Sequence, residues 1–112
     1  MSYYGADKVI GNYNVMGPVK AALEASMRYI AHELGPKGIR VYAVSPGPLK
    51  TRAASGIAEF DELIEDAARR APAHRVVDIA EVGRVVAFLV GGSASGMTGQ
   101  TIYVDAGLHI VA

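Results

Sequence analysis

The sequence of 112 residues contains no cysteine, and this absence removes several kinds of function at once. A chain without cysteine forms no disulfide and offers no thiolate as a nucleophile or metal ligand. Its three histidines, His32, His74 and His109, are widely separated, and no cluster of carboxylates accompanies them. We therefore expect no metal site, and we expect solvent-exposed or capping roles for the three histidines.

The sequence also lacks net charge and long hydrophobic runs. Eleven basic residues balance eleven acidic ones, so no overall field attracts nucleic acid, anionic lipid or an acidic partner. The longest apolar runs are too short to span a bilayer, and the first residues show no charged leader before an apolar stretch. We expect a cytoplasmic protein that binds neither nucleic acid nor membrane.

Apolar residues make up 51% of the chain, which is enough to form the buried core of one domain. The clearest element is a helix from about Met16 to Leu34. Pro18 is tolerated in its first turn, and Gly35-Pro36 ends it. Apolar residues recur there at steps of three and four: Val19, Leu23, Met27, Ile30 and Leu34.

Two short runs predict strands. Residues Ile39 to Val44 lack alternation, which is typical of a parallel strand buried on both faces, and Gln100 to Asp105 predict a second strand. The sequence Ser45-Pro46-Gly47-Pro48 predicts a sharp turn after the first strand. A glycine turn and an apolar tail follow the second.

Two further helices are expected between the strands. A shorter amphipathic pattern runs from Ile57 to Ala67, and Pro72 interrupts it. Asp78 and Glu81 have the spacing of a capping box, so another helix should begin there and end near Gly91. The order is loop, helix, strand, helix, helix, strand, which predicts an α/β fold with right-handed crossovers.

Two parallel strands do not make a stable sheet by themselves, so the sequence predicts an incomplete domain. The first strand is apolar enough to expect neighbours on both sides. In addition, no glycine-rich turn joins a strand to a helix, so the usual pyrophosphate-binding turn of a dinucleotide fold is absent from the sequence.

The segment 12–24, NYNVMGPVKAALE, resembles the active-site helix of enoyl-acyl-carrier-protein reductases, a divergent branch of the short-chain dehydrogenase/reductase family. The resemblance covers nearly the whole chain in order. It also includes Ser2-Tyr3, Gly38 to Val41, Ser45 to Thr51, Ala53 to Ile57, Gly96 to Gln100 and Val104 to Gly107. It implies residues 1–112 are the carboxyl-terminal part of one Rossmann-type domain that lacks its amino-terminal strands.

The spacing between the tyrosine and the lysine resembles the spacing found in this branch and differs from that of the rest of the family. Ordinary members carry a tyrosine four residues before the helix lysine, where this chain has Met16. Here Tyr13 stands seven residues before Lys20. If helical geometry extends to Tyr13, the two side chains share a face, roughly 10 Å apart along the axis.

The resemblance implies a catalytic role for three residues. Tyr13 would hydrogen-bond the thioester carbonyl of an enoyl substrate while NADH delivers hydride to the β-carbon. Lys20 would hold the nicotinamide ribose hydroxyls, and Tyr3 matches the second active-site tyrosine, which contacts substrate. Without the surrounding match, a tyrosine and a lysine near a helix start would be ordinary surface residues.

The resemblance also implies binding residues. Pro46, Gly47 and Leu49 would belong to the cofactor-binding turn, where backbone groups near Leu49 bind the nicotinamide carboxamide, and Thr51 would contact the cofactor phosphates. Residues 53–63 resemble a mobile loop that closes over the acyl chain. Its candidate substrate contacts are Ala53, Ala54, Phe60 and Leu63, of which Phe60 and Leu63 could equally be core residues.

The expected partner is an enoyl thioester on acyl carrier protein, and the complete enzyme is expected to be a homo-oligomer, a tetramer by resemblance. Two features depart from the family. Arg52 replaces an apolar residue, and acidic residues crowd the segment where basic ones would meet an acidic carrier protein. The acidic residues are Glu59, Asp61, Glu62, Glu65 and Asp66, and Arg69, Arg70 and Arg75 follow as an alternative positive face or a solvated one.

Three interpretations remain open at this point. The chain is part of a working enoyl reductase, a non-catalytic remnant that serves in assembly, or part of another short-chain dehydrogenase that acts on a carbonyl. The methionine at position 16 argues against the third.

Overall fold

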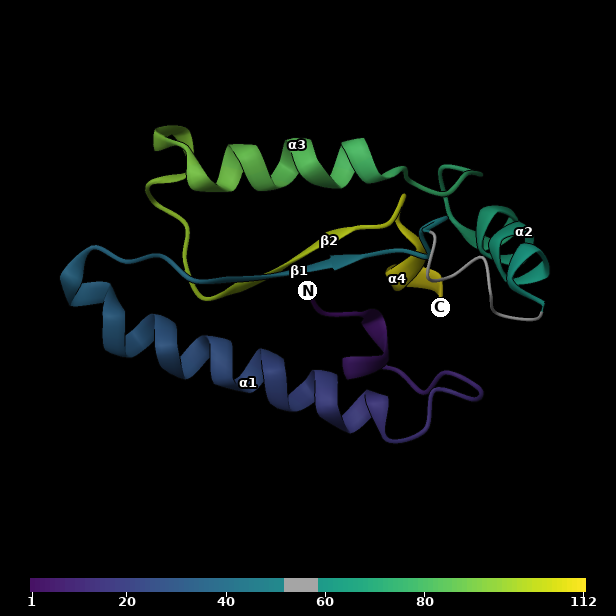
Figure 1. The fold of residues 1–112 in the computed structure, drawn as a ribbon, viewed down its shortest axis with the longest axis horizontal. Helices are drawn as coiled ribbons and strands as arrows, with labels where there is room; N and C mark the ends of the chain where they lie inside the picture. The colour runs from purple at the N-terminus through teal and green to yellow at the C-terminus, as the bar shows by residue number, and fades with distance from the viewer. Residues whose placement is uncertain (52–58) are drawn as a thin grey trace.

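The computed structural model describes residues 1–51 and 59–112, and it arranges them in three layers. A parallel pair of strands, β1 (Tyr42–Pro46) and β2 (Gln100–Val104), lies in the middle, with α1 (Met16–Leu34) on one side and α3 (Ile79–Val90) on the other (Figure 1). The helices α2 (Phe60–Arg70) and α4 (Leu108–Val111) lie at the end of the molecule where β1 ends (Figure 1). The predicted α/β order and the parallel pairing are confirmed.

Helix α1 has the bounds that the sequence predicted. Pro18 is its third residue, where a missing N–H costs no helical hydrogen bond. A short 3-10 segment, η2 (Gly35–Lys37), follows, and Gly38 then adopts the left-handed conformation with φ of 74°. Only Met27 and Ala31 of α1 are buried, so much of the predicted apolar stripe faces outward.

The first strand differs from its predicted range, Ile39 to Val44, because β1 begins later and includes Pro46. Hydrogen bonds explain why proline fits. Gly99 N donates to Val41 O and Gly47 N donates to Val104 O, so the odd-numbered residues of β1 face β2. Pro46 is even-numbered, and its nitrogen therefore faces the opposite edge, where no ladder bond is lost.

Helix α3 begins at the predicted capping box and covers one face of the sheet. Asp78 Oδ1 accepts from Glu81 N at 2.7 Å, and Glu81 Oε2 accepts from Asp78 N at 2.9 Å. Val82 and Leu89 then pack with Val44 in the main buried cluster. Tyr42, on the same face of β1 as Val44, packs against this cluster.

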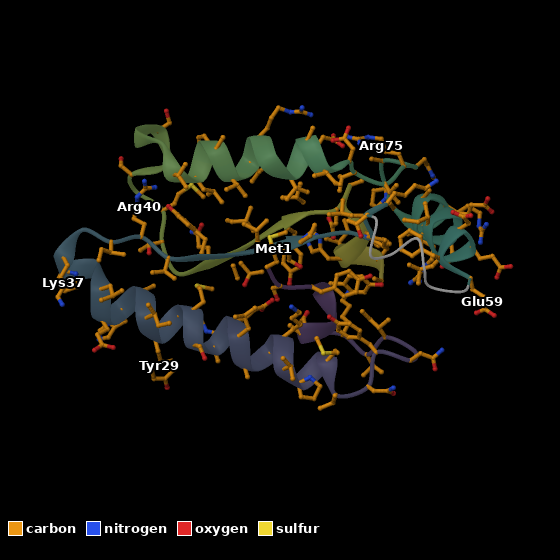
Figure 2. All side chains as sticks on the ribbon, in the orientation of Figure 1. Met1, Tyr29, Lys37, Arg40, Glu59 and Arg75 are labelled. Carbon is orange, nitrogen blue, oxygen red and sulfur yellow. The ribbon has the colours of Figure 1, made fainter. Side chains whose placement is uncertain are left out.

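The carboxyl end of α3 is held by Arg40. Its Nη1 donates to Leu89 O at 2.8 Å, a carbonyl that the last turn of α3 leaves free, and to Ala94 O at 2.7 Å beyond the helix (Figure 2). Ala94 belongs to the 3-10 segment η4 (Gly92–Ala94), which links α3 to the loop before β2. Arg40 thus fixes the connection that brings β2 beside β1.

Two segments predicted as irregular contain short helices. The first dozen residues include the 3-10 turn η1 (Tyr4–Ala6), and the apolar tail forms α4, whose Leu108 packs with Ala67 and Ala71. Both are too short to show a period in the sequence. Among the helices in the described part of the chain, none is long and apolar enough to cross a bilayer.

Candidate active site

Tyr13 lies in a turn before α1, so the condition under which Tyr13 and Lys20 would share a helical face is not met. The helix begins only at Met16. Asn12 and Asn14 have φ values of 62° and 52°, and such left-handed residues cannot belong to a right-handed helix. Asparagine tolerates this conformation better than most residues, which explains why it flanks Tyr13 on both sides.

Tyr13 meets Tyr3, the other candidate catalytic tyrosine. Their ring centroids are 5.3 Å apart with an interplanar angle of 65°, an edge-on arrangement that aromatic pairs favour. Gly5 lies directly beneath the Tyr13 ring, because a Cβ at this position would fall 2.5 Å from a ring carbon. A larger residue at position 5 would therefore displace Tyr13.

Both tyrosine hydroxyls keep their proton at neutral pH. Burial raises the pKa of Tyr13. Burial also raises the pKa of Tyr3 strongly, and the neighbouring Tyr4 and Tyr13 add to the increase. Each hydroxyl can therefore donate a hydrogen bond, which is what a developing negative oxygen requires.

Open space adjoins Tyr13. A hollow of ≈ 580 Å³ is lined by the loop from Gly5 to Asn14 and by Gly17, Pro18 and Ala21 of α1. Tyr13 therefore borders a space that a second molecule can enter. The structure places this hollow at the end of α1 where the helix begins.

Lys20 projects from the second turn of α1 toward the start of the chain. Its Nζ donates to Met1 O at 3.0 Å, and the side chain is half-buried. An ammonium group has three donors, so two remain for a ligand. The chain terminus lies between α1 and β1 (Figure 1).

The candidate cofactor residues lie at the carboxyl end of β1. Pro46 and Gly47 are buried, and a Cβ on Gly47 would lie 3.1 Å from the Asp105 Cβ, so the close approach requires glycine. Leu49 packs against the main buried cluster, and Thr51 is half-buried. In parallel sheets this edge is where ligands bind, and α1 begins at the same end of the molecule (Figure 1).

The candidate substrate loop is only partly described. Ala53 and Ala54 lie outside the described residues. Of the segment 53–63, which we predicted to be a mobile loop, the structure describes only the part from Glu59 onward. Phe60 starts α2 and is half-buried, whereas Leu63 is 47% exposed. The alternative that Leu63 is a core residue is wrong, because Ile64 and Ala67 form the buried face of α2.

The arginines that could have formed a positive face are paired with carboxylates of this chain. Arg69 and Arg70 contact Asp66 at 3.0 and 3.7 Å, and Arg75 contacts Glu81 at 2.7 Å. The pairing with Arg75 lowers the pKa of Glu81 to about 2. This arrangement favours the solvated-face interpretation over a docking surface for an acidic protein.

Sequence reasoning missed the surroundings of His109. Its Nδ1 lies 2.9 Å from Asp105 Oδ2, and its ring stacks on Tyr103 with centroids 3.9 Å apart. The spacing of four residues between the aspartate and the histidine was the available signal. Across residues 1–51 and 59–112, no three His, Asp or Glu side chains gather as a metal site would require.

A family model described as enoyl-(acyl carrier protein) reductase matches residues 1–109. The chain belongs to this family. Its fold agrees with that of a crystal structure of the Bacillus cereus enoyl-acyl carrier protein reductase with NADP+ and indole naphthyridinone, at a TM-score of 0.93 and 45% identity. That alignment covers 99% of this chain and 43% of the other, which confirms a partial Rossmann-type fold.

Two relatives of this chain are named as reductases that use NADH or NADPH. The chain is 51% identical over 111 residues to enoyl-[acyl-carrier-protein] reductase [NADH] 1 of Rhizobium meliloti, covering 99% of the chain and 41% of the relative. It is 44% identical over 110 residues to a Staphylococcus aureus enoyl-[acyl-carrier-protein] reductase [NADPH], covering 98% and 43%. The chain spans about two fifths of the length of these relatives.

Proposed function

We propose that this chain is the part of a cytoplasmic enoyl-acyl-carrier-protein reductase that carries its catalytic residues, and that the complete enzyme reduces the trans-2 double bond of enoyl thioesters in fatty-acid synthesis. One observation carries the proposal. Two protonated tyrosines, Tyr3 and Tyr13, meet at the start of the helix that carries Lys20, beside an open hollow. The family match over residues 1–109 supports the same assignment.

The proposed mechanism gives each side chain one task. The Tyr13 hydroxyl donates a hydrogen bond to the thioester carbonyl oxygen, which becomes more negative as the double bond is reduced. Tyr3 packs edge-on against the Tyr13 ring and limits its movement. Lys20, which contacts Met1 two residues before Tyr3, adds positive charge. NADH, when bound, supplies the hydride to the β-carbon.

The donor set of this chain fits the nicotinamide end of such a cofactor. Lys20 has two donors to spare, and a ribose diol offers two acceptors. The turn at Pro46 and Gly47 provides a close backbone approach at the ligand-binding edge. The sequence holds no glycine-rich turn for the pyrophosphate, so residues beyond this segment must bind that group.

We propose NADH as the reductant, as in the name of the Rhizobium meliloti relative, although the Staphylococcus aureus relative is named for NADPH. We also propose that the complete enzyme is a homo-oligomer. Apolar side chains on α1 support this, because Val19, Leu23 and Ile30 are each 40–47% exposed.

The proposed substrate class is tested in a completed enzyme, in which these 112 residues replace the matching 41% of the Rhizobium meliloti reductase. We expect it to oxidise NADH with a trans-2-enoyl thioester and to be far slower with a 3-ketoacyl thioester. The consumption of NADH is measured with each substrate under identical conditions. Preference for the ketoacyl thioester would show that the chain belongs to a carbonyl reductase.

Replacing Lys20 by Ala should raise the KM for NADH of the completed enzyme about 10- to 100-fold, because charge-assisted hydrogen bonds to the cofactor are lost. Steady-state kinetics at varied NADH measure this change. Lys37→Ala is the control, since Lys37 is exposed at the far end of the molecule (Figure 2). An unchanged KM in the Lys20 variant would remove Lys20 from the cofactor site.

A further inference from the structure

Ser2 joins the start of the chain to two elements at once. Its side chain and backbone are buried, with only 4% of the residue exposed. Ser2 N donates to Val44 O of β1 at 2.7 Å, and Ser2 Oγ donates to a carboxylate oxygen of Glu24 on α1. The residue that follows Ser2 is Tyr3, so these two bonds fix the point from which Tyr3 extends to meet Tyr13.

Lys20 and Glu24 are one helical turn apart on α1, and they form hydrogen bonds with the first two residues of the chain. Lys20 donates to Met1 O, and Glu24 accepts from Ser2. Opposite charges four residues apart on a helix normally attract each other. Even so, the ion pairs found among the described residues do not include Lys20 with Glu24.

The carboxylate of Glu24 is directed toward the sheet. Tyr103 stands opposite Ser45 in the β1–β2 register. Burial raises the pKa of Tyr103, and the negative charge of Glu24 is the next cause of the increase. Because Ser2 binds Val44 of β1 through its backbone and Glu24 through its hydroxyl, the partly buried Glu24 carboxylate is held on the side of α1 that faces the sheet.

We propose that Ser2 and Glu24 form a positioning pair for the active site, an inference that rests on the proposed function. The Ser2 hydroxyl keeps its proton and holds the Glu24 carboxylate away from Lys20, which leaves the Lys20 ammonium free for the cofactor. The same hydrogen bond fixes the segment that carries Tyr3. Neither residue touches the reacting atoms, so both act through Lys20 and Tyr3.

The decisive experiment compares Ser2→Ala with Ser2→Ala/Glu24→Gln in the completed enzyme. Ser2→Ala releases the carboxylate to pair with Lys20, so we expect the KM and the Kd for NADH to rise about tenfold. Adding Glu24→Gln removes the competing charge, so both constants should return toward those of the unsubstituted enzyme. Ser2→Ala should also lower turnover, because Tyr3 is no longer held in place by the hydrogen bond of Ser2 to Glu24. This loss should remain in the double variant, which does not restore that bond.

A matched control and a second variant keep the test sharp. Ser26→Ala removes a different serine hydroxyl, one that lies on α1 and donates to Ala22 O at 2.8 Å, and should change neither constant. Glu24→Asp keeps the charge near Lys20 but shortens its reach to Ser2, so it should weaken NADH binding like Ser2→Ala. This second variant decides the question if Ser2→Ala does not fold.

The measurements separate this inference from the proposed function. NADH binding is followed by fluorescence titration, which needs no turnover. Weaker binding in Ser2→Ala that Glu24→Gln reverses supports the pair even if enoyl reduction is absent, and that absence would contradict only the proposed function. Unchanged binding in Ser2→Ala and Glu24→Asp, or a double variant no better than Ser2→Ala, would overturn the positioning pair.

Discussion

Replacing Tyr13 by Phe should lower the turnover number of the completed enzyme about 100-fold, the usual cost of losing one donor to a developing oxyanion. The phenylalanine ring keeps the packing on Gly5 and the edge-on contact with Tyr3, so the fold and the KM for NADH should change little. Steady-state kinetics with an enoyl thioester give the turnover number, and thermal unfolding checks the fold.

The matched control for this substitution is Tyr29→Phe. Tyr29 is 79% exposed and points away from the sheet on the outer side of α1, so losing its hydroxyl should leave turnover unchanged (Figure 2). Full turnover in the Tyr13 variant, or an equal loss in both variants, would show that the Tyr13 hydroxyl has no specific part in the reaction.

The second large effect concerns the 112-residue chain alone, which should self-associate or be marginally folded and should bind no measurable NADH. Its radius of gyration is 14.9 Å, whereas a compact domain of this length is expected near ~13 Å. The described residues form a sheet of two strands, too few for independent stability unless other surfaces are well covered.

Three features of the structure explain this expectation. The edge of β1 that faces away from β2 accepts a hydrogen bond from Ser2 N at Val44 O. The rest of this edge can pair with a strand of another chain. Apolar side chains of α3 are exposed, with Phe88 at 48% and Val90 at 73%. The Ser45 hydroxyl is fully buried without a hydrogen-bond partner in the described chain, which costs about 1–3 kcal/mol.

Sedimentation and a cofactor titration test the behaviour of the lone chain. We expect a distribution of associated species, or a monomer that unfolds without a sharp transition, and no saturable NADH binding. A monomer that unfolds cooperatively and binds NADH at micromolar concentration would mean that the chain holds far more of a dinucleotide site than the structure indicates.

The parts of the fold that could be predicted are those specified by local chemistry. Helix α1 has a long apolar period between Pro18 and Gly35, and α3 has a capping box, so their bounds could be read directly. The range predicted for the first strand, Ile39 to Val44, begins three residues and ends two residues before that of β1. Whether Pro46 can end a strand depends on which edge its nitrogen faces, and that is a property of the pairing with β2.

The candidate site was predictable in composition but not in geometry. The resemblance selected Tyr3, Tyr13 and Lys20, and the structure brings the two tyrosines together. Their roles, and those of the binding residues, stay predictions. Tyr13 and Lys20 would share a helical face only if the helix reached Tyr13, and it does not, because Asn14 adopts a left-handed conformation that residue spacing alone does not reveal.

Contacts that depend on tertiary packing could not be predicted from the periodic pattern of the sequence. Ser2 and Glu24 are separated by 22 positions and meet only because α1 packs beside the start of the chain. His109 is four residues from Asp105, but its stacking on Tyr103 depends on where β2 ends and α4 begins. Such pairs follow from tertiary packing and leave no periodic signal.

The most direct test of the central claim is the rate of NADH oxidation by the completed enzyme with a trans-2-enoyl thioester, compared with the same enzyme carrying Tyr13→Phe and Lys20→Ala together. If this chain supplies the catalytic residues of an enoyl reductase, the unsubstituted protein turns over at a rate comparable to the Rhizobium meliloti reductase, and the double variant loses nearly all of it. A folded, NADH-binding protein that does not reduce the thioester, or a double variant that still does, would contradict the account.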